Sequence, residues 1–145
     1  WLTCATGTLA YIILTDQFSR NIHRNQARAF STDRAAITAA KIAISRGCDM
    51  RVDEPARHFF YMPLMHSENL CDQDRCVRLM LTRLPESGAD NLMHAKAHRE
   101  IIRQFGRFPF RNAALSRVTT IAEAAFMNDG AYGAIVEGLK AKEAA

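Results

Sequence analysis

Four arginines at every fourth position (Arg99, Arg103, Arg107 and Arg111) are the first feature of the sequence that could do chemistry. They lie in the segment HREIIRQFGRFPFRN, residues 98–112, which also holds three phenylalanines. A guanidinium group is costly to bury and needs a carboxylate, a carbonyl or an anionic ligand as its partner. Arginines beside aromatic residues therefore predict either a network of structural ion pairs or an anion-binding site. The sequence leaves this choice open.

Polar residues also occupy places where helical spacing predicts a buried side chain. Asp16 continues the apolar stripe of an early helix, and His98 lies on the stripe of a later one with His94 a turn before it. His66 and Glu68 end an apolar segment. Because buried polar groups need hydrogen-bond partners, we expect these side chains to meet one another or the arginines.

Two interpretations of these residues remain open. In the first, ion pairs fix how the helices cross; the residues concerned are Asp16, Arg20, Glu68, Arg107 and Arg111. In the second, His66, Glu68 and His98 line a pocket with an arginine, where an anion binds or acid–base chemistry occurs. In an enzyme of this kind, Glu68 or His66 would be the base and His98 the acid. Arg107 and Arg111 would then hold the substrate.

Several familiar catalytic and metal-binding patterns do not occur. His94 and His98 have the spacing of two zinc ligands, but Ala95 stands where a HExxH motif requires glutamate. There is no glycine-rich phosphate loop and no GxSxG sequence. The four cysteines form neither a CxxC pair nor a zinc-ligand spacing. We therefore expect no metal, no cofactor and no covalent catalysis.

The composition is that of an ordinary globular domain. The chain has 145 residues, of which 48% are hydrophobic and 23% charged, with a net charge of +4. Only four of the 19 basic residues are lysines, which favours planar ion pairs over loose binding to nucleic acid. The longest apolar run, Leu9–Leu14, is too short to span a bilayer. These features predict a reduced, cytoplasmic protein that binds neither nucleic acid nor membrane; they do not predict its oligomeric state.

The elements that must position these residues are predicted to be helices. Apolar spacing and capping residues place them at about 9–18, 33–46, 55–65, 71–84, 90–105 and 120–127. Gly106 ends the fifth helix, Pro63 should kink the third or end it early, and Thr120 with Glu123 forms a capping box for the sixth. No segment alternates as a strand would, so the predicted fold class is all-α.

We expect a single all-helical domain over residues 1–130, followed by a weakly patterned tail over residues 131–145 that forms at most a loose helix.

Five motifs occur in order along this domain. They are DQFSRN (16–21), ARAFSTD (27–33), FFYMPLMHSE (59–68), DQDR (72–75) and HREIIRQFGRFPFRN (98–112). Together they resemble the bacterial family catalogued as Domain of Unknown Function 924. The resemblance implies antiparallel helix hairpins in a tetratricopeptide-like α-α superhelix, and no established biochemical function. It also implies that an N-terminal helical portion of the family domain is missing from this chain.

The family pattern also carries over to individual polar positions of this chain, and we interpret these positions by their chemistry. We expect a ligand to be bound by Arg20, Tyr61, His66, Glu68, His98, Arg107, Arg111 and Asn112, and a structural polar network to be formed by Asp16, Gln17 and Asn21. The chain departs from the family pattern at Ser19, where proline is common, and at Phe110, where histidine is common. We expect a binding module whose groove holds an acidic peptide or a small anion. The alternatives are a hydrolase or lyase acting on an anionic small molecule, or a purely structural network.

Overall fold

All the regular structure of the chain is helical, as the sequence predicts. The computed structural model describes residues 1–145 and contains no strand. Its α-helices are α1 (Ala5–Ile12), α2 (Ser19–Ile22), α3 (Asp33–Ser45), α4 (Met62–Met65), α5 (Leu70–Arg83), α6 (Ala89–Phe105), α7 (Ile121–Asn128) and α8 (Ala131–Ala144). Short 3-10 helices span Ala27–Phe30, Asp49–Arg51, Ala56–Phe60 and Pro109–Arg111. No helix combines the length and the apolar character needed to cross a membrane.

The first helical rod is longer than predicted and changes type along its length. A π-helical segment, Ile13–Phe18, joins α1 to α2, and the backbone stays helical through both junctions. A π-helical turn accommodates an extra residue and is often found at functional sites. Asp16 lies within this segment, with only 1% of its surface exposed.

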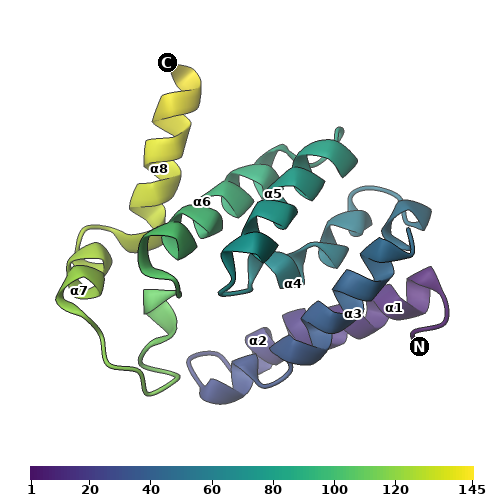
Figure 1. Ribbon diagram of the computed structural model, residues 1–145, viewed down its shortest axis with the longest axis horizontal. Coiled ribbons are helices and arrows are strands. Elements are labelled where there is room, and N and C mark those ends of the chain that lie inside the picture. The colour runs from purple at the N-terminus through teal and green to yellow at the C-terminus, as the bar shows by residue number, and fades with distance from the viewer.

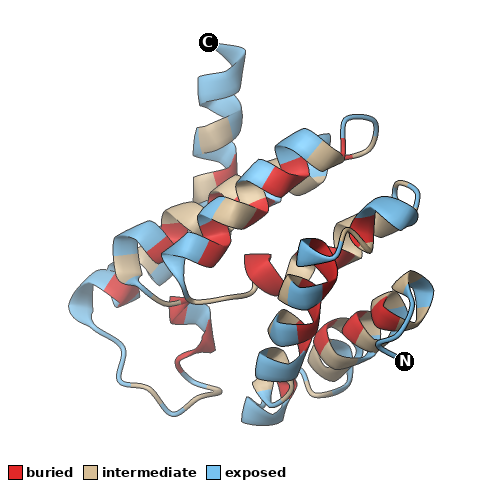
Figure 2. Ribbon diagram, turned by 45° about the vertical axis from the view of Figure 1, so that its right-hand side comes forward, coloured by how far each residue is buried: buried red, intermediate tan, exposed pale blue.

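The helices pack in neighbouring pairs along the molecule. Helix α1 lies against α3, α5 lies against α6, and α8 packs on α6 at the far end (Figure 1). The alanine stripe of α3 (Ala36, Ala39, Ala40 and Ala43) is buried, so its neighbours approach closely. Figure 2 shows that the buried residues of these helices lie on the sides that face other elements.

The buried apolar residues form two clusters. His66 follows Met65 of the first cluster in the chain, and the ring of His98 contacts Phe108 of the second. The first contains fourteen buried residues from α1, α3, the 56–65 segment, α5 and the start of α6. The second contains Ile101, Ile102 and Phe108, with Tyr132 and Ile135 of α8 packed against them.

Two predictions about individual elements need correction. The third predicted helix, 55–65, is divided into the 3-10 helix Ala56–Phe60 and the single turn α4. Pro63 lies in the first turn of α4, where its missing N–H costs nothing, so it starts a new helix instead of kinking a long one. The tail is the regular helix α8, held to the protein by buried Val136.

Candidate functional site

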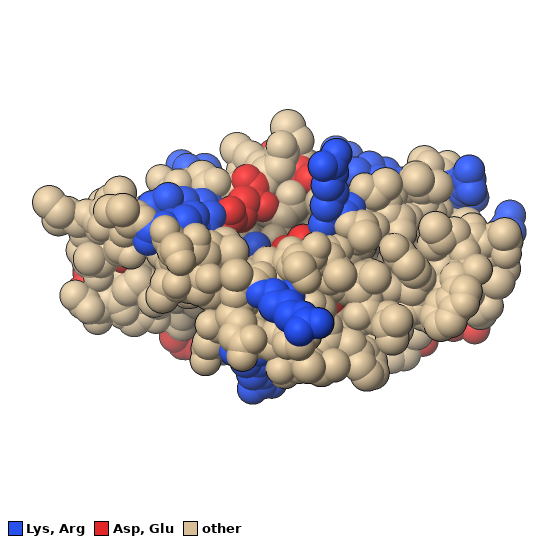
Figure 3. All heavy atoms as spheres, turned by 90° about the horizontal axis from the view of Figure 1, so that it is seen from below, with Lys and Arg blue, Asp and Glu red and all other residues tan.

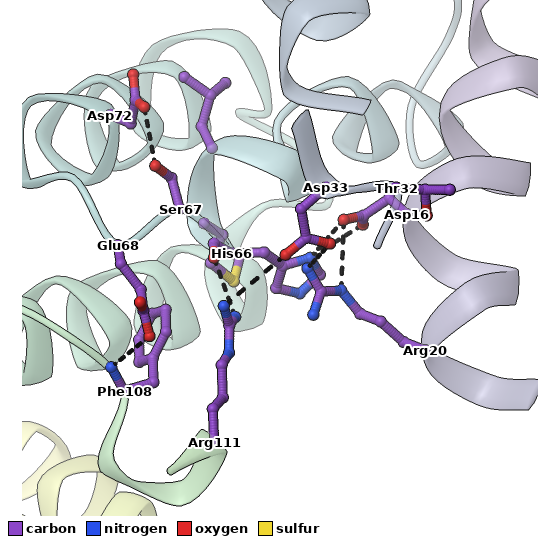
Figure 4. Close-up of polar contacts among 12 residues, drawn as sticks. Asp16, Arg20, Thr32, Asp33, His66, Ser67, Glu68, Asp72, Phe108 and Arg111 are labelled. Carbon is purple, nitrogen blue, oxygen red and sulfur yellow. Dashed lines mark hydrogen bonds and ion pairs between the residues drawn. The ribbon is translucent and has the colours of Figure 1, made fainter. Parts of the chain in front are cut away.

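The centre of the candidate site is a contact between Asp16 and His66, fifty positions apart in the sequence. His66 caps the C-terminus of α4, and its Nδ1 lies 2.9 Å and 3.0 Å from the two carboxylate oxygens of Asp16 (Figure 4). An ionised carboxylate only accepts hydrogen bonds, so Nδ1 must carry the proton. This leaves Nε2 as an unprotonated nitrogen with no partner from the protein.

Neighbouring groups keep this pair in its ionised-carboxylate, neutral-imidazole form. Burial opposes ionisation of Asp16, but His66 and Arg20 outweigh it and lower the pKa of the carboxyl. Gln17 also donates to Asp16, at 2.6 Å. Burial lowers the pKa of His66, although the charge of Asp16 and its hydrogen bond act to raise it. A carboxylate that holds a neutral imidazole in one tautomer is the arrangement found in many general bases.

Arg111 approaches the same place from the 3-10 helix after α6. Its side chain is 7% exposed and lies between the rings of Phe30 and Phe108, with Cζ 4.9 Å and 4.4 Å from the ring centroids. One nitrogen donates to the backbone carbonyl of His66 at 3.0 Å, and another lies 3.9 Å from Asp33. Burial, together with the nearby Arg20, lowers the pKa of Arg111 to about 10. Arg111 is thus a largely buried cation whose remaining N–H groups have no protein partner and are reached by solvent.

Asp33 and Arg20 complete the charged part of the site. Arg20 donates to Asp33 at 2.8 Å and to Asp16 at 3.4 Å, so it links the first rod to the start of α3. Burial raises the pKa of Asp33 in spite of the two neighbouring arginines. On the face seen in Figure 3, basic and acidic side chains lie close together around a hollow near the middle of the molecule.

His98 adds a second neutral imidazole. Its Nδ1 lies 2.8 Å from the backbone carbonyl of His94, which again places the proton on Nδ1 and leaves Nε2 free. The ring centroids of His98 and His66 are 6.3 Å apart, and the rings of Phe108 and Tyr132 contact His98 edge-on. Burial lowers the pKa of His98 to about 3.

Three cavities meet at His66. The arginine cavity, about 290 Å³, is lined by Arg20, Arg24, Arg111, both imidazoles and Phe30, with no carboxylate in its wall. The mixed-charge cavity, about 330 Å³, shares Arg20 and Arg111 with it and is also lined by four carboxylates. The apolar cavity, about 500 Å³, lies beyond the two histidines and is lined by methionines and aromatic rings.

Glu68 does not have the role expected of a base. Its two oxygens accept from Arg117 at 2.7 Å and 2.9 Å, and one also accepts from the amide of Phe108 at 2.9 Å. Burial opposes ionisation, but these hydrogen bonds outweigh it and lower the pKa of Glu68. The carboxylate therefore anchors the segment 107–117 that presents Arg111, and it is less available to accept a proton than Nε2 of His66, which has no partner from the protein.

The run of four arginines is dispersed. Arg103 pairs with Glu100 and Arg99 lies 3.5 Å from Asp74, both at the surface. Arg107 makes a two-pronged pair with the buried Glu123, at 2.6 Å and 2.8 Å, and lines none of the three cavities. Of the four, only Arg111 reaches the site, because Gly106 (φ +69°) ends α6 and redirects the chain.

Three other predicted residues lie apart from the cavities. Tyr61 is fully buried and donates to Asp49 at 2.6 Å, so it belongs to the core. Asn112 is buried and donates to Glu123 at 3.2 Å. Asn21 is exposed and accepts from Arg24 at 3.4 Å. These three side chains are positioned to support the structure and not to touch a ligand.

Sequence reasoning missed four residues of the site. Asp33, Arg24 and Phe30 contact or line it, and Arg117 fixes Glu68. In the sequence, Asp33 gives a signal only as a residue suited to the start of a helix, although it and Phe30 lie in the motif ARAFSTD. Arg117 lies in no motif and had no signal in the sequence.

The comparisons with other proteins agree with the motif resemblance. The family described as "Bacterial protein of unknown function (DUF924)" matches residues 1–131. The chain belongs to this family. The solved structure of a protein of unknown function from Agrobacterium tumefaciens is similar, with 41% identity and a TM-score of 0.83, covering 89% of this chain and 71% of that one. No curated protein is significantly similar to the chain. These descriptions name no activity, so a function has to be argued from the site.

Proposed function

We propose that the protein binds a small anionic molecule in the arginine cavity, with Arg111 as its main contact. The observation that carries the proposal is the under-partnered state of this buried guanidinium, which makes one hydrogen bond of 3.0 Å and one loose ion pair of 3.9 Å. A carboxylate or phosphate oxygen would supply the missing acceptors, since guanidinium groups bind such anions through two parallel hydrogen bonds.

The charges around the cavity support the same ligand class. Three arginines line it, and the carboxylates nearby are already paired, Asp16 and Asp33 with Arg20 and Glu68 with Arg117. With both histidines neutral, the three lining arginines and Arg117 face these three carboxylates, so one positive charge is in excess. The cavity has the size of a small-molecule pocket, which favours a small anion over an acidic peptide.

Calorimetry and thermal unfolding with inorganic phosphate, acetate and succinate test the proposal. The test variant is Arg111→Met, and the matched control is Arg103→Met, which removes an arginine that is 64% exposed on the outer face of α6. A ligand at one hundred times its Kd stabilises the folded state by about 2.7 kcal/mol. We expect this gain in the wild type and the control and not in Arg111→Met. Equal binding by both variants, or binding of no anion at all, would contradict the proposal.

A second function, hydrolysis of the bound anion, is favoured by the Asp16–His66 pair. Nε2 of His66 would take a proton from a water molecule as its oxygen attacks an ester or phosphoryl group. The bond to the leaving oxygen would break, and this oxygen would receive a proton from the imidazolium. Arg111 and Arg20 would stabilise the negative charge that develops on the attacked group.

Turnover of carboxylate-bearing esters and phosphate monoesters tests this second function. We expect His66→Gln to abolish turnover while anion binding persists, because Gln lacks a nitrogen that can accept a proton. Since the pKa of His66 is lowered, the rate should stay constant from pH 8 down to pH 6.5, the ordinary pKa of a histidine. Turnover that survives in His66→Gln would exclude His66 as the base.

Two finer expectations from the sequence remain predictions alongside this proposal. They are the tetratricopeptide-like stacking of the hairpins and the cytoplasmic location. Anion binding in the arginine cavity requires neither of them.

A further inference from the structure

The arginine cavity adjoins a second cavity of different chemistry. The apolar cavity has a volume of about 500 Å³, and Met62, Met65, Phe110 and Tyr132 form much of its wall. It is lined by no lysine, arginine, aspartate or glutamate. A site that bound only phosphate or a short acid would leave this second cavity unused.

The two cavities share part of their wall. His66, His98 and Phe110 line both of them, so a ligand group that passes these three side chains leaves the arginines and enters apolar surroundings. Both imidazoles direct Nδ1–H to protein oxygens and carry no charge there, so an apolar group can pass without burying a cation.

The wall of the apolar cavity comes from separate elements. Met62 and Met65 belong to α4, His98 to α6, Phe110 to the 3-10 helix after it, and Tyr132 to α8. Methionine side chains are flexible and polarisable, and they adapt to apolar groups of different shapes. This composition suits a hydrocarbon chain better than a polar ring, because few hydrogen-bonding groups point into the space.

We propose that the ligand is an amphipathic carboxylate, with its carboxylate on Arg111 in the arginine cavity and its hydrocarbon part in the apolar cavity. This inference rests on the proposed anion binding and adds the ligand class. The carboxylate accepts from the N–H groups of Arg111 that have no protein partner, and the chain runs along the side chains of His66, His98 and Phe110 toward Met62.

Isothermal calorimetry with a graded set of probes tests the inference. The probes are inorganic phosphate, acetate, butanoate and octanoate, with octanol as the uncharged counterpart of octanoate, all below their aggregation concentrations. Burying two more methylene groups raises affinity about tenfold. We therefore expect octanoate to bind the wild type at least about tenfold more tightly than acetate. Octanol should bind much more weakly than octanoate, because it cannot use Arg111.

Two variants separate the two ends of the ligand. Met62→Gln keeps the length of a partly buried side chain but makes it polar, so it should weaken octanoate binding much more than acetate binding. Arg111→Met should weaken acetate and octanoate alike, and Arg103→Met is the control for both. As a second readout, octanoate and not acetate should shift the NMR methyl signals of Met62 and Met65.

The failures of the two proposals are distinguishable. If acetate and octanoate bind equally well through Arg111, the ligand class is wrong and anion binding stands. If octanol binds as tightly as octanoate, the apolar cavity works without the arginines and the ligand class is again wrong. If none of the anions binds, both proposals fail.

Discussion

At the scale of single residues, Arg107 and Arg111 are one helical turn apart in spacing and yet have different surroundings. Arg107 meets a carboxylate, Glu123, that is only 3% exposed, and its hydrogen bonds lower the pKa of Glu123 to about 2. Arg111 donates to the backbone carbonyl of His66 and lies 3.9 Å from the carboxylate of Asp33. The first pair is a structural contact, and the second arginine is left available to a ligand.

The two arginines should therefore differ in their contribution to stability. Arg111→Met keeps the apolar packing between Phe30 and Phe108 and removes a poorly compensated charge, so we expect a loss of about 1 kcal/mol or less. Arg107→Met leaves Glu123 without its main partner and should lower the urea midpoint distinctly more. Urea unfolding of both variants checks this, and the reverse order would contradict the assignment.

The buried histidines should make stability depend on pH. His98 has a pKa of about 3 in the folded protein against an ordinary value of 6.5, so between these values only the unfolded chain is protonated there. Stability is then complete above pH 6.5 and is lost as the pH falls toward 3. The slope is at most about 1.4 kcal/mol per pH unit for one group. The charged and titratable groups around it are His66, His94, Arg111 and, from α8, Tyr132.

Unfolding of the wild type and His98→Gln between pH 7 and pH 5 measures this contribution. The range lies above the ordinary pKa of the carboxylates, so the histidines dominate the change. We expect a smaller slope in His98→Gln, with His66 responsible for part of the remainder. An unchanged slope would mean that His98 is protonated equally easily in both states.

At the scale of elements, the carboxylate of Glu68 joins the segment 107–117 to the end of α4, and Glu123 of α7 binds the same segment at Arg107 and Asn112. Glu68 accepts from Arg117 and from the amide of Phe108, and these contacts join the end of α4 to the chain after α6. The segment has little regular structure beyond the 3-10 helix Pro109–Arg111. Its position, and with it that of Arg111, depends on this contact.

Glu68→Gln should loosen the segment without unfolding the helices. Glutamine keeps the shape but loses the charge, so the two-pronged contact with Arg117 weakens. We expect faster hydrogen exchange of the Phe108 amide and of residues 107–117, and weaker acetate binding. The control is Glu86→Gln, since Glu86 is exposed and its carboxylate has no hydrogen bond in the structure. Equal exchange in both variants would show that Glu68 does not anchor the segment.

At the scale of the whole molecule, the two apolar clusters differ greatly in size. The first has fourteen buried residues and the second has three. Elements with few buried apolar contacts open at a lower free energy than the global unfolding transition. The part built on the second cluster, α7 and α8, is therefore expected to be the less stable end.

Native-state hydrogen exchange should reveal this difference directly. Amides in the middle of α7 and α8 should exchange through openings that cost less free energy than those exposing α3 and α5. Octanoate should slow exchange at the start of α8, because Tyr132 lines the apolar cavity. Uniform protection along the chain would contradict the division into a larger and a smaller cluster.

Local sequence patterns predicted much of the helical fold, but they predicted fewer of the contacts in the candidate site. The Gly106 stop and the Thr120–Glu123 capping box are local signals, and each is present as predicted. The positions of Asp16, His66 and His98 on apolar faces also predicted that these side chains would contact other polar groups, as they do. Which of them touch could not follow, because Asp16 and His66 are fifty positions apart.

The wrong expectations have the same physical origin. Regular four-residue spacing suggested that Arg107 and Arg111 act together, but the left-handed turn at Gly106 breaks the helix before them. Glu68 looked like a free base because its partner, Arg117, lies 49 positions away outside every motif. Long-range pairing depends on how elements pack, and helical periodicity carries no information about it.

The π-helical segment that holds Asp16 has a consequence for the length of the chain. Its wider turn contains an extra residue, and Leu14 within it is 53% exposed. Removing one residue from this segment would return the rod to an ordinary α-helix in which α1 and α2 keep the faces that they now present to the rest of the protein. The segment is therefore a point at which sequences can differ in length by one residue without changing how the rod packs. An alignment of relatives should place a single-residue gap between Ile12 and Ser19 in those that lack the wider turn.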